Sequence, residues 1–452
     1  MSSALEAERG QAELQDTGRG LGLGLYAVTI FLSAFLLFQV QPMIAKMIVP
    51  WFGGSASVWT TCLLFFQTVL LLGYLYAHGS MSRLKAPVRG PVHVGLLLVS
   101  LAALPSLIAL RSGSGGHWTP TGSEEPTGRI LLVLLATVGG PYFLLSTTGP
   151  LLQAWAARLF TQGKSPYRLY ALSNTGSLLA LLGYPVLVEP TLTLRQQAVT
   201  WSVGYVLFVA LCSLIAWRQP RSGVAHEANA AIGDAARPSV GMHLLWMGLA
   251  AVASVLLLAV TNHLSQNVAA IPFLWVLPLT LYLLSFILCF GPARWEWKPA
   301  FLPLPALAVG AMAYAHAQQF ENLSIQALIA VFAAGLFVCC ILCHGELARL
   351  KPPPQYLTSF YLMLSLGGAL GGAFVALVAP HVFRDYYELP LAIGACALVA
   401  LFALYREPRP RWWRDGAWWA AAALTAGLIV SLGLDIRNTA HSFRPGEHNV
   451  LT

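Results

Sequence analysis

The chain has 452 residues, of which 57% are hydrophobic and 10% are Asp, Glu, Lys or Arg, whereas ordinary soluble domains carry about 25% charged residues. So small a polar surface excludes a water-soluble catalytic body. The formal net charge of +8 is spread over short loops, a distribution that membrane topology explains without a nucleic-acid partner.

The first 23 residues are polar and contain no short apolar core with a small-residue cleavage site, so no removable signal peptide is expected. Apolar runs of about 20 residues then recur, and each can cross about 30 Å of hydrocarbon as a helix. The predicted spans lie near 24–45, 57–79, 91–110, 129–152, 169–189, 196–217, 242–264, 270–291, 300–317, 324–344, 356–379, 387–405 and 416–434. We therefore expect an all-α, polytopic membrane helix bundle with about 12 to 13 transmembrane helices.

Basic residues are unevenly divided between alternate loops. Seventeen Lys and Arg residues follow even-numbered spans, whereas Lys46 and four arginines follow odd-numbered spans. The positive-inside rule then places the N-terminus in the cytoplasm. We expect a multi-pass protein of a bacterial inner (plasma) membrane. Thirteen spans would leave the C-terminus outside, and twelve would leave it inside.

The two halves of the chain share short sequences in the same order. Ala27-Val-Thr-Ile-Phe-Leu-Ser33 in the first span matches Ala259-Val-Thr-Asn-His-Leu-Ser265 in the seventh, with two differences. Weaker matches link the fourth span to the tenth and the fifth to the eleventh. Corresponding spans are six apart and run in the same direction, which predicts a parallel six-plus-six repeat, the plan of major-facilitator transporters.

This repeat divides the chain into five segments. They are a polar cytoplasmic segment (1–23), a first six-helix half (24–217), a cytoplasmic linker (218–241), a second six-helix half (242–405), and a basic loop with an additional helix and short tail (406–452).

Polar side chains within the apolar runs concentrate on the first, fourth, seventh and tenth spans, and such groups tend to face a bundle interior or cavity. Asn262 with Gln266 and His263 with Asn267 are pairs four residues apart, so they form one stripe on a helix. These amides either contact a ligand or bridge helices. The candidate ligand-binding residues are Gln39, Gln41, Thr147, Thr148, Asn262, His263, Gln266, Asn267, His344 and Glu346.

Four charged residues lie near the ends of predicted spans. Lys46 and Glu189 fall at the external ends, where an interfacial anchor is the main interpretation and a translocation charge the alternative. Glu346 and Arg349 are about one turn apart and are expected to form a local ion pair. That pair belongs either to a solvated helix end, which we favour, or to a gate.

Neither a cofactor nor a metal is expected. Cys340-Ile-Leu-Cys343-His344 matches the attachment pattern of c-type haem but lies within an apolar helix at the predicted cytoplasmic face. Structural zinc requires four tetrahedral ligands, and only the closely spaced Cys339, Cys340, Cys343 and His344 are at hand, so no zinc site is expected. Gly368 and Gly372 have the small-x-x-x-small spacing that lets helices approach closely.

Several longer strings resemble the membrane region of bacterial spermidine-synthase-like proteins, in which a transporter-like module is fused to a spermidine synthase. They include Gln41-Pro-Met-Ile-Ala-Lys46, Pro50-Trp-Phe-Gly-Gly-Ser55, Pro272-Phe-Leu-Trp-Val-Leu-Pro278 and Cys343-His-Gly-Glu-Leu-Ala-Arg349. The resemblance covers nearly all of residues 25–405. The soluble aminopropyltransferase domain of the fused members has no counterpart after the last span, so this chain is not expected to be an enzyme on its own.

The resemblance implies a transporter-like module that binds or moves a small, polyamine-related solute. A polycation in a membrane cavity requires carboxylates, and only Glu189, Glu346 and Glu388 fall within or just beyond the spans. The alternative function is a membrane anchor or subunit for a separately encoded aminopropyltransferase-like enzyme. A third is an intramembrane enzyme that uses His344 or His263 as an acid-base group. The expected partners are the lipid bilayer, an unknown small solute and a soluble synthase-like protein.

Overall fold

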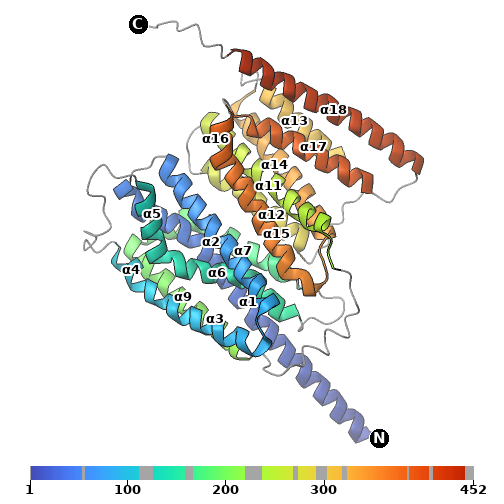
Figure 1. Ribbon diagram of the computed structural model, residues 1–452. Helices are drawn as coiled ribbons and strands as arrows, with labels where there is room; N and C mark the ends of the chain where they lie inside the picture. Colours follow the sequence, from blue (N-terminus) through green and yellow to red (C-terminus); the bar gives the residue numbers. More distant parts are fainter. Residues whose placement is uncertain are drawn as a thin grey trace. The chain divides into compact units, whose positions relative to one another are not determined.

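The structure is a computed structural model that describes residues 2–52, 56–110, 126–157, 166–218, 237–267, 273–291, 303–317, 323–383, 386–406 and 411–442. Over these residues every regular element is a helix (Figure 1). Within these described ranges, ten helices are long and apolar enough to cross a membrane, and shorter apolar helices occupy Val276–Phe290 and Trp418–Leu434. Together with the helix Pro303–Ala317 they account for every predicted span, which confirms the all-α polytopic bundle.

The chain divides into two compact units, each with its own apolar core. Unit 1 comprises Met1–Val240, Phe290–Pro292 and Lys351–Ser365, and unit 2 comprises Gly241–Cys289, Ala293–Leu350 and Leu366–Thr452.

Unit 1 is built around α1, which packs against α6, α7 and α9. Its helices are α1 (Ser2–Phe52), α2 (Ala56–Arg83), α3 (Ala86–Ser100), α4 (Leu104–Ala109), α5 (Pro126–Leu134), α6 (Gly140–Ala156), α7 (Arg168–Gly183), α8 (Glu189–Thr191) and α9 (Leu194–Trp217). Gly176 on α7 lets the two backbones approach, since a Cβ atom there would lie 2.8 Å from the Phe31 carbonyl oxygen. The buried Trp201 indole on α9 donates a hydrogen bond to the Leu36 carbonyl at 2.9 Å. These contacts hold α1 at the centre of the unit.

Unit 2 contains α11 (Val240–Asn267), α12 (Phe273–Phe290), α13 (Pro303–Ala317), α14 (Ile325–Arg349), the second part of α15 (Leu357–Ala373), α16 (Ala379–Val382), α17 (Glu388–Arg406) and α18 (Arg411–Ser442). α13 packs against α14 and α17. α18, the helix beyond the six-plus-six plan, runs beside α17 and also contacts α13 (Figure 1).

The glycines of α15 that allow close packing lie one residue before the predicted pair, Gly368 and Gly372. A Cβ atom at Gly367 would lie 2.2 Å from the Met247 carbonyl oxygen of α11, and one at Gly371 would lie 2.7 Å from that of Ala251. At Gly368 the same atom would meet nothing within 4 Å. The close approach therefore uses Gly367 and Gly371, because a shift of one residue turns a helix position by about 100°.

The fifth and eleventh predicted spans contain the same local irregularity, as a parallel repeat predicts. The fifth span contains the π-helical segment Tyr184–Val188, after which Glu189 donates its N–H to the Tyr184 carbonyl, five residues earlier. The eleventh span contains the π-helical segment Phe374–Val378, after which Ala379 donates its N–H to the Phe374 carbonyl in the same way. The residue after each is a proline, Pro190 and Pro380. Because proline clashes with the carbonyl four residues before it, the extra residue in the π turn relieves that clash.

Candidate functional site

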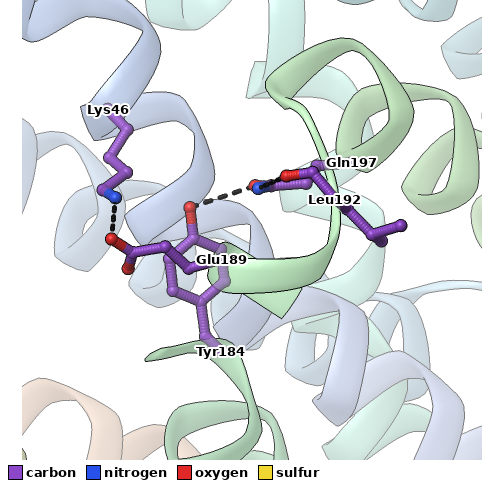
Figure 2. Close-up of polar contacts among 5 residues, drawn as sticks. All are labelled: Lys46, Tyr184, Glu189, Leu192 and Gln197. Atoms are coloured by element: carbon purple, nitrogen blue, oxygen red, sulfur yellow. Dashed lines mark hydrogen bonds and ion pairs between the residues drawn. The ribbon is translucent and has the colours of Figure 1, made fainter. Parts of the chain in front are cut away.

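Lys46 and Glu189 form an ion pair between the C-terminal part of α1 and α8 (Figure 2). Their side chains are 44% and 39% exposed, so the pair lies at the surface of unit 1. The sequence places both residues at the same end of their spans but does not pair them, because 143 residues separate them. Lys46 lies within α1, and not in a loop as predicted.

A buried hydrogen-bond network lies beside this ion pair (Figure 2). The Tyr184 hydroxyl donates to Gln197 Oε1 at 3.1 Å, and Gln197 Nε2 donates to the Leu192 carbonyl at 2.8 Å. The π turn brings Tyr184 and Glu189 to the same place on the helix. Neither Tyr184 nor Gln197 is among the sequence candidates. The only signal nearby is the Thr193 to Gln196 capping box that starts α9.

The candidates on the first and fourth spans have different roles. Gln41 Nε2 donates to the buried Tyr142 hydroxyl at 3.1 Å, which links α1 to α6, and Gln39 is half-buried. Thr147 and Thr148 are fully buried, and both hydroxyls donate to the Leu144 carbonyl of their own helix, at 2.8 and 3.0 Å. This local bonding favours the structural interpretation for the two threonines.

Gln153 at the end of α6 carries a polar group that its surroundings do not fully satisfy. Its Oε1 accepts a hydrogen bond of 2.6 Å from the Tyr361 hydroxyl, within unit 1. Its Nε2 is buried and has no hydrogen-bond partner in the part of the chain that the structure describes. Both residues are fully buried, and the Tyr170 ring stacks on Tyr361 with centroids 4.8 Å apart. Gln153 therefore presents a donor inside an aromatic cluster.

Tyr167 completes this cluster. Its hydroxyl donates to the Pro352 carbonyl at 2.7 Å, and the Lys351 ammonium lies 5.5 Å from its ring centroid. Burial raises the pKa of Tyr167, so the phenol remains a neutral donor. Gln153 is not among the sequence candidates, and nothing in the sequence marks its tyrosine neighbours.

In unit 2, His344 is fully buried between α14 and α12. Its Nδ1 lies 2.7 Å from Ser285 Oγ, and its ring stacks on Phe286 with centroids 3.5 Å apart. Because Ser285 donates its single O–H to the Tyr282 carbonyl, its oxygen accepts from His344 Nδ1–H. His344 Nε2 is then an acceptor, and it has no hydrogen-bond partner among the described residues.

Glu346 lies on another face of α14 from His344. Its Oε1 accepts a hydrogen bond of 2.9 Å from Arg349 Nη1, which confirms the predicted local ion pair. The Glu346 side chain is only 2% exposed, however, whereas that of Arg349 is 42% exposed. The expectation of a solvated helix end is therefore wrong for the carboxylate. Glu346 lines a cavity of about 270 Å³ among α13, α14, α17 and α18.

The stripe predicted on α11 is described only in part. Asn262 and His263 are half-buried, and the side chains of Gln266 and Asn267 lie outside the described residues. The His263 ring contacts Phe332, with centroids 4.6 Å apart, and His316, with centroids 5.8 Å apart. His316 is not among the sequence candidates.

Cys339, Cys340 and Cys343 are buried free thiols in the core of unit 2. Within the described ranges, no group of three or more His, Cys, Asp or Glu residues is arranged to hold a metal ion.

Comparison of the sequence with known proteins finds no matching family model and no similar curated protein. The fold, by contrast, matches solved membrane transporters. One is the major facilitator superfamily proton:xylose symporter XylE bound to 6-bromo-6-deoxy-D-glucose. It is 13% identical to this chain in sequence, and the match covers 86% of this chain and 97% of that chain with a TM-score of 0.55. Another is a bacterial homologue of the iron transporter ferroportin in an outward-facing state with soaked iron, which is 12% identical, with 85% and 99% covered and a TM-score of 0.55.

The chain has the major facilitator fold. A double-tryptophan mutant of XylE agrees, at 13% identity and a TM-score of 0.53, with 83% of this chain and 94% of that chain covered. Identities this low establish the fold alone. The major facilitator fold fits the parallel six-plus-six plan predicted from the repeat, while the link to spermidine-synthase-like proteins stays a resemblance.

Proposed function

We propose that this chain is a transporter that binds a small solute and moves it across a membrane. The observation that carries the proposal is that the chain matches nearly the full length of two transporters with unlike ligands, a sugar derivative and iron. A fold alone does not assign a function, so the argument also needs a site.

Two buried polar atoms supply that argument. Gln153 Nε2 is a donor in unit 1 and His344 Nε2 is an acceptor in unit 2, and neither has a hydrogen-bond partner among the described residues. Leaving such an atom buried and unpaired costs about 1–3 kcal/mol. A solute that accepts a hydrogen bond from Gln153 Nε2 would offset this cost in unit 1, and one that donates a hydrogen bond to His344 Nε2 would offset it in unit 2. We therefore propose Gln153 and His344 as separate candidate contacts, each within its own unit, beside the predicted Gln39, Gln41, Asn262 and His263.

We take a polyamine-related solute, the class implied by the sequence resemblance, as the first candidate. The charges provide a direct test of it, because a polycation requires carboxylates to compensate its charge. Glu189 and Glu346 are each paired with a cation already, Lys46 and Arg349. A polyamine would have to displace these partners, whereas a neutral or zwitterionic solute would not.

The topology completes the proposal. We propose that the protein lies in a bacterial inner membrane with its N-terminus in the cytoplasm, and that residues 24–217 and 242–405 are its two functional halves. The alternative proposal is a membrane anchor for a separately encoded aminopropyltransferase-like enzyme, which the same resemblance supports.

A thermal-shift screen of the detergent-purified chain separates these proposals. Spermidine, putrescine, amino acids, nucleosides and a pentose would each be added, because a ligand at a hundred times its Kd stabilises the folded state by about 2.7 kcal/mol. The transporter proposal predicts a saturable rise in Tm with one class, lost in Gln153→Met. Ser202→Ala is the control, because Ser202 is buried in the same unit and its hydroxyl donates to the Ala198 carbonyl of its own helix. No shift, with co-purification of a synthase-like protein, would favour the anchor.

A further inference from the structure

The cavity in unit 2 is lined by α13, α14, α17 and the additional helix α18, and its wall includes neither His344 nor His263. Its volume is about 270 Å³. An engineered apolar cavity of about 150 Å³ stays dry and binds benzene. The cavity beside α18 therefore has room for a molecule of two fused rings.

Three of the four walls consist mainly of small or apolar side chains. α17 supplies Ala397 and Ala400, α18 supplies Ala421, and α13 supplies Gly310. A Cβ atom at Gly310 would meet nothing within 4 Å, so the space begins directly at the backbone. A flat ring fits between helices whose facing residues are this small, whereas a branched molecule would push them apart.

The cavity opens to the surface of the unit between α13 and α18. Ala306 and Gly310 on α13 are exposed, and Leu424 on α18 is 72% exposed. Leu424 lies within the apolar helix Trp418–Leu434, where exposed side chains of a membrane span face hydrocarbon. A ligand therefore enters from the bilayer, and its solubility in lipid is the first requirement on its chemistry.

Thr425 provides the hydroxyl of the cavity wall, and this hydroxyl is not bonded to its own helix. The hydroxyls of Thr29, Thr175 and Thr261 each donate to the carbonyl four residues earlier, as is usual in membrane helices. Among the described residues, Thr425 makes neither this bond, to the Ala421 carbonyl, nor any other hydrogen bond. Because an unpaired hydroxyl in an apolar environment is costly, a ligand with one polar oxygen would be favoured there.

We propose that this cavity binds a lipophilic phenol of two fused rings, for which 2-naphthol is the probe. The rings lie between α13, α17 and α18, and the phenolic oxygen exchanges a hydrogen bond with Thr425. Naphthalene should bind more weakly, because a site that bonds a hydroxyl rejects the analogue that lacks it. Binding at this cavity depends neither on the identity of the transported solute nor on the direction of transport.

The test is equilibrium dialysis of radiolabelled 2-naphthol against the delipidated, detergent-purified full chain, with the same detergent concentration on both sides. We expect saturable binding of one molecule per chain, and an affinity for naphthalene that is about tenfold lower. Uptake that rises linearly with concentration, at the level of detergent alone, would overturn the proposal. So would a tightly retained phospholipid that 2-naphthol fails to displace in native mass spectrometry, because an acyl chain would then be the occupant.

Two pairs of variants locate the site. Gly310→Leu fills the mouth and should weaken binding of 2-naphthol about tenfold, whereas Gly368→Leu, with equally open space at its Cβ, should leave it unchanged. Thr425→Val keeps the shape but removes the hydroxyl, and it should weaken binding about three- to tenfold. Thr425→Ser keeps the hydroxyl and should retain the binding. Wild-type affinity in a monodisperse preparation of Thr425→Val would contradict the assignment.

Discussion

The Tyr361 hydroxyl donates a 2.6 Å hydrogen bond to Gln153, 208 residues earlier in the chain. This bond attaches the start of α15 to the end of α6 within unit 1. It also orients the Gln153 amide, so that Oε1 is occupied and Nε2 is the atom left for a solute. The position of the proposed solute contact therefore depends on Tyr361.

Tyr361→Phe should destabilise the protein by about 1–3 kcal/mol, because Gln153 Oε1 would stay buried without its donor. The measurement is the Tm of the purified protein. Tyr314→Phe is the matched control, since Tyr314 is 60% exposed on α13 and its hydroxyl should contribute less than about 0.5 kcal/mol. Equal Tm values for the two variants would show that the Tyr361 bond is not made.

Reversing the charges of Lys46 and Glu189 should restore what each single reversal loses. Lys46→Glu and Glu189→Lys each place like charges together, whereas the double variant recreates an ion pair. Because both side chains are partly exposed, the pair should contribute only about 0.2–1 kcal/mol. A double-mutant cycle in Tm, with Arg195→Glu as an exposed control, measures it. A double variant less stable than both single variants would exclude the pair.

Gly367→Ala and Gly368→Ala should differ sharply although they are neighbours. The first places a methyl group against the α11 backbone and should cost about 1–3 kcal/mol or prevent accumulation of folded protein. The second meets nothing within 4 Å and gains helix propensity, so it should be neutral or stabilising. Fluorescence-detected size-exclusion chromatography after a heating series compares them. If Gly368→Ala were the less stable variant, the close contact would lie on the face that the sequence predicts.

Ser285→Ala should leave His344 Nδ1–H buried without an acceptor and lower the stability by about 1–3 kcal/mol. Ser285→Thr keeps the hydroxyl and should retain more of the Tm. Ser202→Ala again serves as the control. If Ser285→Ala and Ser202→Ala have the same Tm, Ser285 does not orient the histidine.

The sequence predicts the helices well, because membrane spans are specified by long local runs of apolar residues. It also predicts the Glu346 and Arg349 pair, since residues three apart on a helix are neighbours. The π turns before Pro190 and Pro380 follow from proline chemistry, although their pairing becomes visible only when the two spans are compared.

What the sequence could not predict depends on which helices become neighbours. The partner of Gln153 is more than two hundred residues away, and nothing local marks Tyr361 as its donor. The burial of Glu346 follows from the packing of α13, α17 and α18 around the end of α14. Whether Gly367 or Gly368 contacts α11 depends on a rotation of about 100°, which a pattern of four glycines leaves open.

Solute uptake into proteoliposomes tests the central claim most directly. The purified chain would be reconstituted, and uptake of the radiolabelled solute that raises its Tm would be followed for the wild type, Gln153→Met and Ser202→Ala. The account predicts saturable uptake by the wild type and Ser202→Ala, and at least a tenfold loss with Gln153→Met. Uptake at the level of protein-free liposomes, from a chain that still binds the solute, would contradict the transporter proposal.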